Sequence, residues 1–322
     1  MITITAKINP ETISQAAGII RAGGLVAFPT ETVYGLGADA LNPEAVRKIY
    51  EAKGRPSDNP LILHVSSFEQ ARNLVYVNDV AEILMKTFWP GPLTLVLPAK
   101  PVVPLVTRGG LDTAAIRMPD NSVAQALIEA SGTPIAAPSA NLSGRPSPTD
   151  FDSVYNDMNG RIEMILDGGK VDVGIESTVI DITNPDKILM LRPGGMPREL
   201  IENALNAKLN TPDDISKKRS PGTRYKHYSP NIPVIIWKRD EKFPDVDFDS
   251  AAYMGVHDVE YNCGEKTLFA DVNHYAQGLF AGFRKFEARG KISCIVVEWP
   301  EGDSGVSEGL RDRIARAAGI KS

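Results

Sequence analysis

Short apolar runs alternate with helix-like segments between residues 12 and 205, and this alternation constrains the fold more than any other feature. Residues 12–21 carry apolar side chains at helical spacing, and residues 25–28 then form a short apolar run. Asn42 and Gly54 fit the capping positions at the two ends of another helix. Helices that alternate with strands favour an α/β layer fold, and adjacent strands without a helix between them indicate a mixed sheet.

The same criteria predict the remaining elements of this region. Apolar or alternating runs predict strands at residues 61–65, 93–97, 114–118, 134–137, 162–166, 178–182 and 188–191. Helical spacing predicts helices at residues 80–88, 123–130, 151–158 and 198–205. Gly35 and Gly37 are expected to serve a tight turn, because glycine adopts turn conformations without a steric penalty. We therefore expect one twisted mixed sheet with helices flanking it.

The chain of 322 residues is longer than most single domains, so we expect two domains. After residue 205 the helix-and-strand pattern gives way to a polar stretch and then to a Pro- and Tyr-containing basic segment. Residues 1–208 are predicted to form the catalytic domain, and residues 209–231 an ordered linker that acts as a lid. Residues 232–322 are predicted to form a smaller C-terminal Rossmann-like α/β domain with a regulatory role.

Composition excludes several classes of protein. The formal net charge of −5 argues against binding of nucleic acid by the whole surface, although a local basic patch stays open. Two cysteines without a CxxC motif and four scattered histidines indicate neither a disulfide framework nor a zinc site. The chain has neither the apolar core of a signal peptide at its start nor an apolar run long enough for a membrane span. We expect a cytoplasmic protein without membrane contact.

Neither of the two common phosphate-binding glycine loops occurs, and GxSxG and HExxH are also absent. Instead, Lys53 and Arg55 flank Gly54 on a loop that Pro56 stiffens, where two cations could hold a polyphosphate. A solvated loop is the alternative reading of these cations. Other polar residues follow the predicted strands, and they include Thr32, His64, Arg117, Ser139, Asn141, Glu176, Ser177 and Arg192. Because ligands of open α/β sheets bind beyond the carboxyl ends of strands, we expect these residues to share one pocket.

Six motifs of this chain together resemble the YrdC-type threonylcarbamoyl-AMP synthases. In chain order they are FPTETVYGLG at 28–37, KGRP at 53–56, WPGPLT at 89–94, RMP at 117–119, PSAN at 138–141 and ESTV at 176–179. The resemblance is dense over residues 10–205, and the segment SPGTRYKHYSP at 220–230 resembles the long, two-domain form. It implies a YrdC-like fold for the first domain.

The resemblance also implies a reaction. The chain would join L-threonine, bicarbonate and ATP into threonylcarbamoyl-AMP and pyrophosphate, and a downstream complex would transfer the threonylcarbamoyl group to tRNA. Direct tRNA binding is compatible with this role but not required. The chemistry needs no covalent enzyme nucleophile, so positioning and phosphate-neutralising cations would suffice. We expect Mg²⁺ to arrive with the ATP phosphates, without a metal site formed by protein side chains.

The resemblance assigns the site residues as well. Lys53 and Arg55 are expected to neutralise phosphate charge, and Arg117 is expected to clamp the carboxylate of the amino acid. The ATP contacts would be Arg55, Asn59, Thr113, Ser139, Asn141, Ser147, Arg192 and Tyr228. The L-threonine contacts would be Thr32, His64, Arg117, Ala137 and Ser177. A turn-capping role stays open for Ser147 and Thr113, and a core role for His64.

Two other functions stay open. One is a double-stranded RNA-binding or ribosome-associated factor without ATP chemistry, because YrdC-like folds present a basic concave face. The other is the carbamoyl-adenylate chemistry of hydrogenase-maturation proteins, but this chain lacks the acylphosphatase-like and zinc-finger segments expected there. Dependence of pyrophosphate release on threonine and bicarbonate would separate these alternatives from the synthase.

Overall fold

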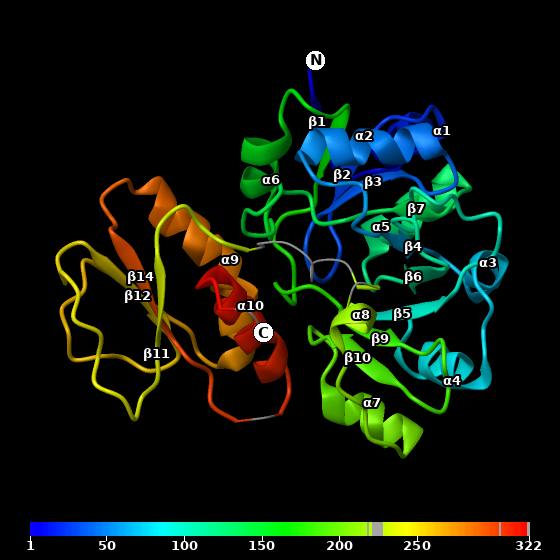
Figure 1. The fold of residues 1–322 in the computed structure, drawn as a ribbon. Helices are drawn as coiled ribbons and strands as arrows, with labels where there is room; N and C mark the ends of the chain where they lie inside the picture. Colours follow the sequence, from blue (N-terminus) through cyan, green and yellow to red (C-terminus); the bar gives the residue numbers. More distant parts are fainter. Residues whose placement is uncertain (218, 221–227, 303, 321–322) are drawn as a thin grey trace.

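The computed structural model describes residues 1–217, 219–220, 228–302 and 304–320, and within them residues 4–192 form a ten-stranded mixed sheet (Figure 1). In spatial order its strands are β1 (Ile4–Lys7), β8 (Met164–Asp167), β2 (Val26–Phe28), β3 (Gly35–Asp39), β7 (Ile135–Ala136), β4 (Ile62–His64), β6 (Thr113–Arg117), β5 (Leu93–Pro98), β9 (Thr178–Asp181) and β10 (Leu189–Arg192). Parallel pairs such as β4 with β6 occur beside antiparallel pairs such as β5 with β6. The predicted mixed α/β sheet is confirmed.

Helices pack on both faces of this sheet. Their bounds are α1 (Pro10–Arg21), α2 (Pro43–Lys53), α3 (Phe68–Leu74), α4 (Asp79–Phe88), α5 (Ser122–Ser131), α6 (Phe151–Met158) and α7 (Arg198–Leu205). Alternate residues of each strand point to opposite faces, so Val26 and Phe28 pack with α1 and α5 whereas Ala27 joins the core under the other helices. The α1–α5 layer covers only the β1–β7 end of its face. Beyond it the same face carries a small apolar cluster that includes Ile62, Ala115 and Val179.

The helix α2 shows how local sequence positions the site. The side chain of Asn42 accepts hydrogen bonds from the backbone N–H groups of Glu44 and Ala45, which caps the first turn. Gly54 ends the helix in the left-handed conformation, with φ of 60°. The helix predicted between these two residues is confirmed. Lys53 is the last residue of this helix, and Arg55 follows directly after Gly54.

The expected tight turn at Gly35 and Gly37 is wrong, because both glycines lie in β3, a strand that the sequence pattern did not predict. A Cβ atom on Gly37 would lie 2.7 Å from the ring of Phe28 and 2.8 Å from Ile135. Glycine is therefore needed for close packing against neighbouring side chains, and the absence of bulky residues hid the strand from a hydrophobicity pattern.

The described residues after 230 form a second sheet of four parallel strands, in the order β11 (Val234–Trp237), β14 (Cys294–Glu298), β12 (Ala251–Gly255) and β13 (Glu265–Leu268). The helices α9 (Val272–Ala288) and α10 (Ser307–Ala317) lie between this sheet and the first domain (Figure 1). The predicted second α/β unit is confirmed. Residues 221–227, the central part of the predicted linker, lie outside the described residues. The domain boundaries at 208 and 231 stay predictions.

The two units meet through a mixed apolar and ionic interface. Val33 and Ile175 of the first unit belong to the same buried cluster as the inner faces of α9 and α10. The short helix α8 (Asp214–Lys217) packs near β10.

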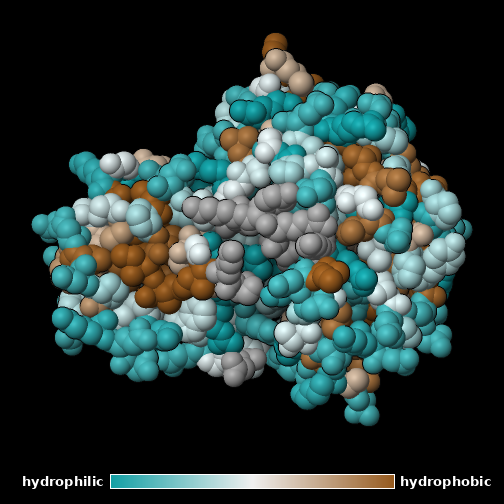
Figure 2. Space-filling model, viewed as in Figure 1, coloured by the Kyte–Doolittle hydropathy of each residue, from teal (hydrophilic) through white to brown (hydrophobic). Residues whose placement is uncertain are grey.

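Figure 2 shows a mostly hydrophilic face, with hydrophobic side chains gathered over the position that β11 has in Figure 1. Among the described residues, no helix combines the length and the apolar character that a membrane crossing requires.

Candidate active site

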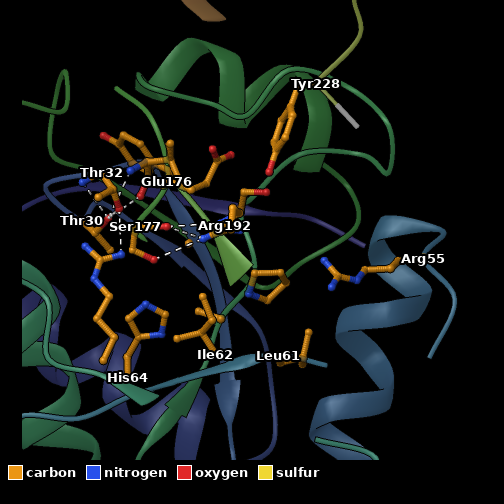
Figure 3. Close-up of a pocket in the computed structure, with 17 residues that line it drawn as sticks. Thr30, Thr32, Arg55, Leu61, Ile62, His64, Glu176, Ser177, Arg192 and Tyr228 are labelled. Atoms are coloured by element: carbon orange, nitrogen blue, oxygen red, sulfur yellow. Dashed lines mark hydrogen bonds between the residues drawn. The ribbon is translucent and has the colours of Figure 1, made fainter. Parts of the chain in front are cut away.

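A pocket opens on the sheet face that the α1–α5 layer leaves uncovered, beside β4 and β6 (Figure 3). His64 and Arg117 end these two strands and are register partners, so both side chains reach the pocket together. The pocket brings together nine residues of the predicted site, namely Thr32, Arg55, His64, Arg117, Ala137, Ser139, Ser177, Arg192 and Tyr228. Five other predicted residues do not line it, namely Lys53, Asn59, Thr113, Asn141 and Ser147.

Arg117 organises one end of the pocket. Its Nη1 donates to Thr32 Oγ1 at 2.9 Å, and its Nε donates to the carbonyl oxygen of Gly91 at 3.2 Å. Its Nη2 lies 2.5 Å from Glu31 Oε1 in a buried ion pair. Glu31 therefore balances the charge of Arg117, and the hydrogen bonds to Thr32 and Gly91 fix the direction of the guanidinium. We assigned no role to Glu31 from sequence, although its position between two threonines of the first motif was a signal.

His64 is buried beside this guanidinium. Burial, with a smaller contribution from the charge of Arg117, lowers the pKa of His64 to about 3. The imidazole is therefore neutral at physiological pH. Its Nδ1 has no hydrogen-bond partner among the described residues, and its ring meets Phe28 edge-on at 6.4 Å between centroids. A neutral ring nitrogen with free hydrogen-bonding capacity can bind a polar ligand without adding charge.

Arg55 enters the pocket from the end of α2, opposite His64 (Figure 3). Its Nη2 donates long hydrogen bonds to the carbonyl oxygens of Asn59 at 3.4 Å and Pro60 at 3.2 Å. Its buried Nε has no partner among the described residues. Burial lowers the pKa of Arg55 to about 10, so the group still carries its charge at neutral pH. This guanidinium retains donors for an anionic ligand.

Arg192 and Ser177 form the floor between these two ends. Arg192 donates through Nε and Nη2 to the carbonyl oxygen of Ser177, at 3.2 and 2.9 Å. The Ser177 hydroxyl lies 2.7 Å from the hydroxyl of Thr94 and 3.3 Å from Arg192 Nη2. Arg192 ends β10 and Ser177 precedes β9, so two neighbouring strands hold this pair in place. Three buried guanidinium groups and one carboxylate, that of Glu176, thus line one pocket. Glu31 balances Arg117 from outside the lining, so these groups together keep a net positive charge, which suits an anionic ligand.

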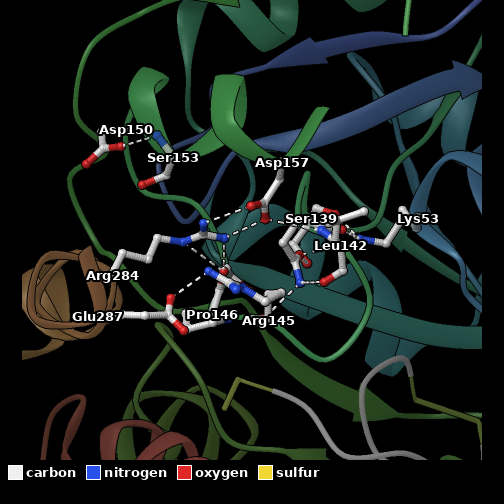
Figure 4. A network of polar contacts seen from close by, with 12 residues as sticks. Lys53, Ser139, Leu142, Arg145, Pro146, Asp150, Ser153, Asp157, Arg284 and Glu287 are labelled. Carbon is white, nitrogen blue, oxygen red and sulfur yellow. Dashed lines mark hydrogen bonds and ion pairs between the residues drawn. The ribbon is translucent and has the colours of Figure 1, made fainter. Parts of the chain in front are cut away.

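The location of Lys53 differs from the expected one. Its Nζ donates to the carbonyl oxygens of Ser139, at 2.6 Å, and of Asn141, and it lies 3.4 Å from Asn141 Oδ1 (Figure 4). These contacts occupy the donors of the ammonium group, and burial lowers its pKa. Asn141 is held further by bonds from its Nδ2 to the carbonyl oxygens of Leu142 and Arg145, both at 2.8 Å. Lys53 therefore lies behind the PSAN loop, whereas Ser139 faces the pocket.

The remaining predicted residues lie at different depths in the pocket wall. Ser147 is buried and donates to Glu176 Oε1 at 2.5 Å, so it lies behind Glu176, which lines the pocket. Asn59 is fully buried next to Arg55, and neither atom of its amide has a hydrogen-bond partner among the described residues. Thr113 is half-buried at the start of β6, where it pairs with Pro98. Thr113 does not line the pocket.

Tyr228, the first described residue after 220, forms the outer wall. Its ring stacks on Phe280 of α9, with 5.4 Å between centroids, and its backbone has φ of 67°. This left-handed conformation is unusual for a bulky residue. Figure 3 shows its hydroxyl pointing into the cavity, toward Arg192 and Arg55. Phe280, a residue of the C-terminal unit, thus supports Tyr228, which precedes that unit in the chain and lines the pocket.

Comparison with known proteins gives full-length matches. Residues 18–194 match the Sua5/YciO/YrdC family model, described as telomere recombination, and residues 196–319 match the threonylcarbamoyl-AMP synthase C-terminal domain model. Threonylcarbamoyl-AMP synthase of Pyrococcus abyssi is 44% identical over 100% of this chain and 98% of that protein. The enzyme of Bacillus subtilis is 43% identical over 99% of this chain and 96% of that protein. The crystal structure of P. abyssi Sua5 complexed with L-threonine is 42% identical, with a TM-score of 0.89 over 99% of this chain and 98% of that one.

Proposed function

The chain belongs to the Sua5/YrdC family of threonylcarbamoyl-AMP synthases, and we propose that its pocket makes threonylcarbamoyl-AMP and pyrophosphate from L-threonine, bicarbonate and ATP. The family membership covers both domains, so the chain is a synthase of the two-domain form. The observation that carries the substrate assignment is the convergence of three buried arginines and a neutral histidine on one pocket.

L-threonine occupies the end of the pocket formed by Thr32, His64, Arg117, Ala137 and Ser177 in this proposal. The P. abyssi relative has been solved with L-threonine, which supports an amino acid site in the family. Arg117 binds the carboxylate, because its hydrogen bonds to Thr32 and Gly91 hold the guanidinium in a fixed direction at the pocket. Neutral His64 and the hydroxyls of Thr32 and Ser177 then form hydrogen bonds with the polar groups of the amino acid, and neutral His64 does not repel its amine.

ATP occupies the other end, and Arg55, Arg192, Ser139 and Tyr228 contact it directly. Arg55 neutralises phosphate charge, because its guanidinium faces the cavity and keeps unused donors. Asn59, Asn141 and Ser147 support the wall from behind the lining residues, whereas Thr113 lies outside the lining. Lys53 holds the PSAN loop in place from behind, through its hydrogen bonds to the carbonyl oxygens of Ser139 and Asn141.

The chemistry proceeds by positioning. The neutral amine of threonine adds to CO₂ with loss of a proton, or condenses with bicarbonate with loss of water, to form a carbamate. A carbamate oxygen then attacks the α-phosphorus of ATP. A new P–O bond forms, the bond to the bridging oxygen of the β-phosphate breaks, and pyrophosphate leaves. The arginines stabilise the charge that moves onto the phosphate oxygens. Because carbamates hydrolyse readily, burial of the pocket under Tyr228 protects the intermediate from water.

A divalent metal ion, Mg²⁺ by our expectation, binds through the ATP phosphates. Among the described residues no group of three or more His, Cys, Asp or Glu side chains is arranged to hold a metal. Magnesium commonly binds nucleotide phosphates with few protein ligands, and it would supply charge neutralisation for the departing pyrophosphate. We also propose a cytoplasmic location, where a downstream complex transfers the threonylcarbamoyl group to tRNA.

A coupled assay of pyrophosphate release tests the proposed function. Threonine, bicarbonate and ATP are omitted one at a time, serine replaces threonine in a further reaction, and the nucleotide product is identified by mass spectrometry. We expect release only with all three substrates, and a product with the mass of threonylcarbamoyl-AMP. ATP left intact by a protein that binds double-stranded RNA tightly would favour the RNA-binding alternative instead.

A further inference from the structure

Arg313 reaches from the C-terminal domain to the wall of the pocket. It belongs to α10, and its side chain is fully buried, with 0% of its area exposed. Its Nε lies 2.6 Å from Glu176 Oε2 across the domain interface. Glu176 lines the pocket and is separated from Arg313 by 137 positions in the chain. Arg313, a buried residue of the C-terminal domain, therefore contacts the pocket residue Glu176 directly.

Both oxygens of this Glu176 carboxylate are engaged. Oε2 accepts from Arg313, and Oε1 accepts from the Ser147 hydroxyl at 2.5 Å. Two donors on opposite sides leave the carboxylate one orientation. Arg313 is itself held by Asp312, whose Oδ2 accepts from its Nη1 at 2.5 Å, and Arg316 binds the same carboxylate at 2.9 Å. This chain of contacts connects α10 to two pocket-wall residues.

The same guanidinium also supports Tyr228. Its central carbon lies 5.2 Å from the centroid of the Tyr228 ring, at the distance of a cation–π contact. Tyr228 has a strained backbone, with φ of 67°, so surrounding contacts must hold it in this conformation. Arg313 and Phe280 provide two of these contacts, and both come from the C-terminal domain.

Two glycines permit the close approach of α10 that this geometry needs. A Cβ atom on Gly309 of α10 would lie 2.8 Å from the carbonyl oxygen of Gly194. A Cβ atom on Gly194 would lie 2.2 Å from the carbonyl oxygen of Glu176. Neither position can hold a side chain without displacing backbone, so α10 rests directly on the segment after β10, beside the backbone of Glu176.

We propose that Arg313 is a positioning residue of the active site, supplied by the C-terminal domain, which holds the Glu176 carboxylate and the Tyr228 ring in their working places. The proposal rests on the proposed function of the pocket. It means that the pocket is complete only while α10 is docked on the first domain. The C-terminal domain then acts on the reaction through a specific ionic contact.

The proposal predicts that the pKa of Glu176 depends on Arg313. Burial would raise the pKa of Glu176, but the charges of Arg313 and Arg192, together with the hydrogen bonds from Ser147 and Arg313, outweigh burial and hold this pKa below its ordinary value. Among the described residues, these two arginines, one on α10 and one at the end of β10, and Tyr228 are the titratable or charged groups that face the carboxylate. Loss of Arg313 therefore raises the pKa of Glu176. A purely structural contact elsewhere in the interface would not change this pKa.

The test compares Arg313→Met, Arg313→Lys and Glu308→Gln with the unchanged chain over a range of pH. Glu308 is a matched control, because it also lies on α10 and pairs with Arg198 across the interface at 2.7 Å, yet with 35% of its side chain exposed and away from the pocket. We expect Arg313→Met to lower kcat/KM at neutral pH about tenfold or more and to move the acid limb of the pH profile upward. Arg313→Lys keeps a cation and should keep the acid limb near its original position. Glu308→Gln should match the unchanged chain in both respects.

The outcomes separate this inference from the proposed function. An unchanged pH profile in Arg313→Met, or the same shift in Glu308→Gln, would overturn the role of Arg313. Absence of threonine-dependent pyrophosphate release from the unchanged chain would instead refute the proposed function. In that case calorimetric titration of ATP into the same four proteins over the same pH range decides the role of Arg313 without turnover. Equal affinities with equal pH dependence would overturn it.

Discussion

The ammonium group of Lys53 lies 2.6 Å from the carbonyl oxygen of Ser139, so a lysine of the KGRP loop binds the PSAN loop from behind. Arg55, two residues later, faces the cavity instead. The two cations of one motif therefore have different surroundings. This difference predicts that their substitution has different consequences.

Lys53→Met should lower the free energy of unfolding and the activity together. The change leaves the buried carbonyl oxygens of Ser139 and Asn141 without their donor, which typically costs about 2–4 kcal/mol in total. Urea denaturation and steady-state kinetics measure the two effects. Lys48→Met is the matched control, because Lys48 lies on the same helix, is exposed and donates to one carbonyl oxygen, that of Gly23. It should change the stability by less than about 0.5 kcal/mol. Equal losses in both variants would contradict this assignment.

Arg55→Met should raise the KM for ATP about tenfold or more, with a smaller effect on the KM for threonine, because it removes a charge-assisted donor from the phosphate end. Its long bonds to Asn59 and Pro60 contribute little to folding, so the unfolding midpoint should change less than in Lys53→Met. Initial rates over a range of ATP concentrations give both constants. Arg47→Met, on the exposed face of α2, is the control. An unaltered KM for ATP in Arg55→Met would remove Arg55 from the phosphate site.

His64 predicts a pH dependence of stability. Its pKa falls from an ordinary value of 6.5 to about 3 in the folded state, mainly because of burial. Between these values the unfolded chain binds one proton more than the folded chain at this residue. The stability contributed by neutral His64 is therefore complete above pH 6.5 and is lost as the pH falls toward 3, by up to about 1.4 kcal/mol per pH unit. His64→Gln should flatten the dependence of unfolding free energy on pH between 4 and 6.5. Parallel curves for the two proteins would show that His64 is not buried in neutral form.

A chain that ends at Asn210 should fold but lose synthesis. The two main apolar clusters of the first domain are built entirely from residues before Asn210, so its core stays intact. The truncation removes Tyr228 from the pocket wall, removes the Arg313 contact to Glu176 and exposes Val33 and Ile175. We expect near-native circular dichroism with activity reduced about a hundredfold, because the groups of the pocket lose the contacts that position them. Full turnover by the truncated chain would refute a role for the C-terminal domain in the site.

Sequence patterns predicted the elements whose signal is local. The helix between Asn42 and Gly54 follows from its two caps, and the alternation of helices and strands predicted the mixed α/β sheet. The polar residues at strand ends were expected to share one pocket, and nine residues of the predicted site do line it. The strand β3 was missed because glycines replace the bulky residues that mark a strand.

What the sequence by itself determined was the fold class and nine of the residues that line the pocket, because capping, periodicity and motif order are properties of neighbouring positions. Only the tertiary structure decided which partner each charge has. Lys53 binds carbonyl oxygens of a distant loop, Glu31 neutralises Arg117, and Arg313 holds Glu176 from the other domain. A buried charge is stable only with a partner at contact distance, and folding brings that partner from anywhere in the chain. The pairing of buried charges, and with it the role of the C-terminal domain, is therefore a property of the packed structure.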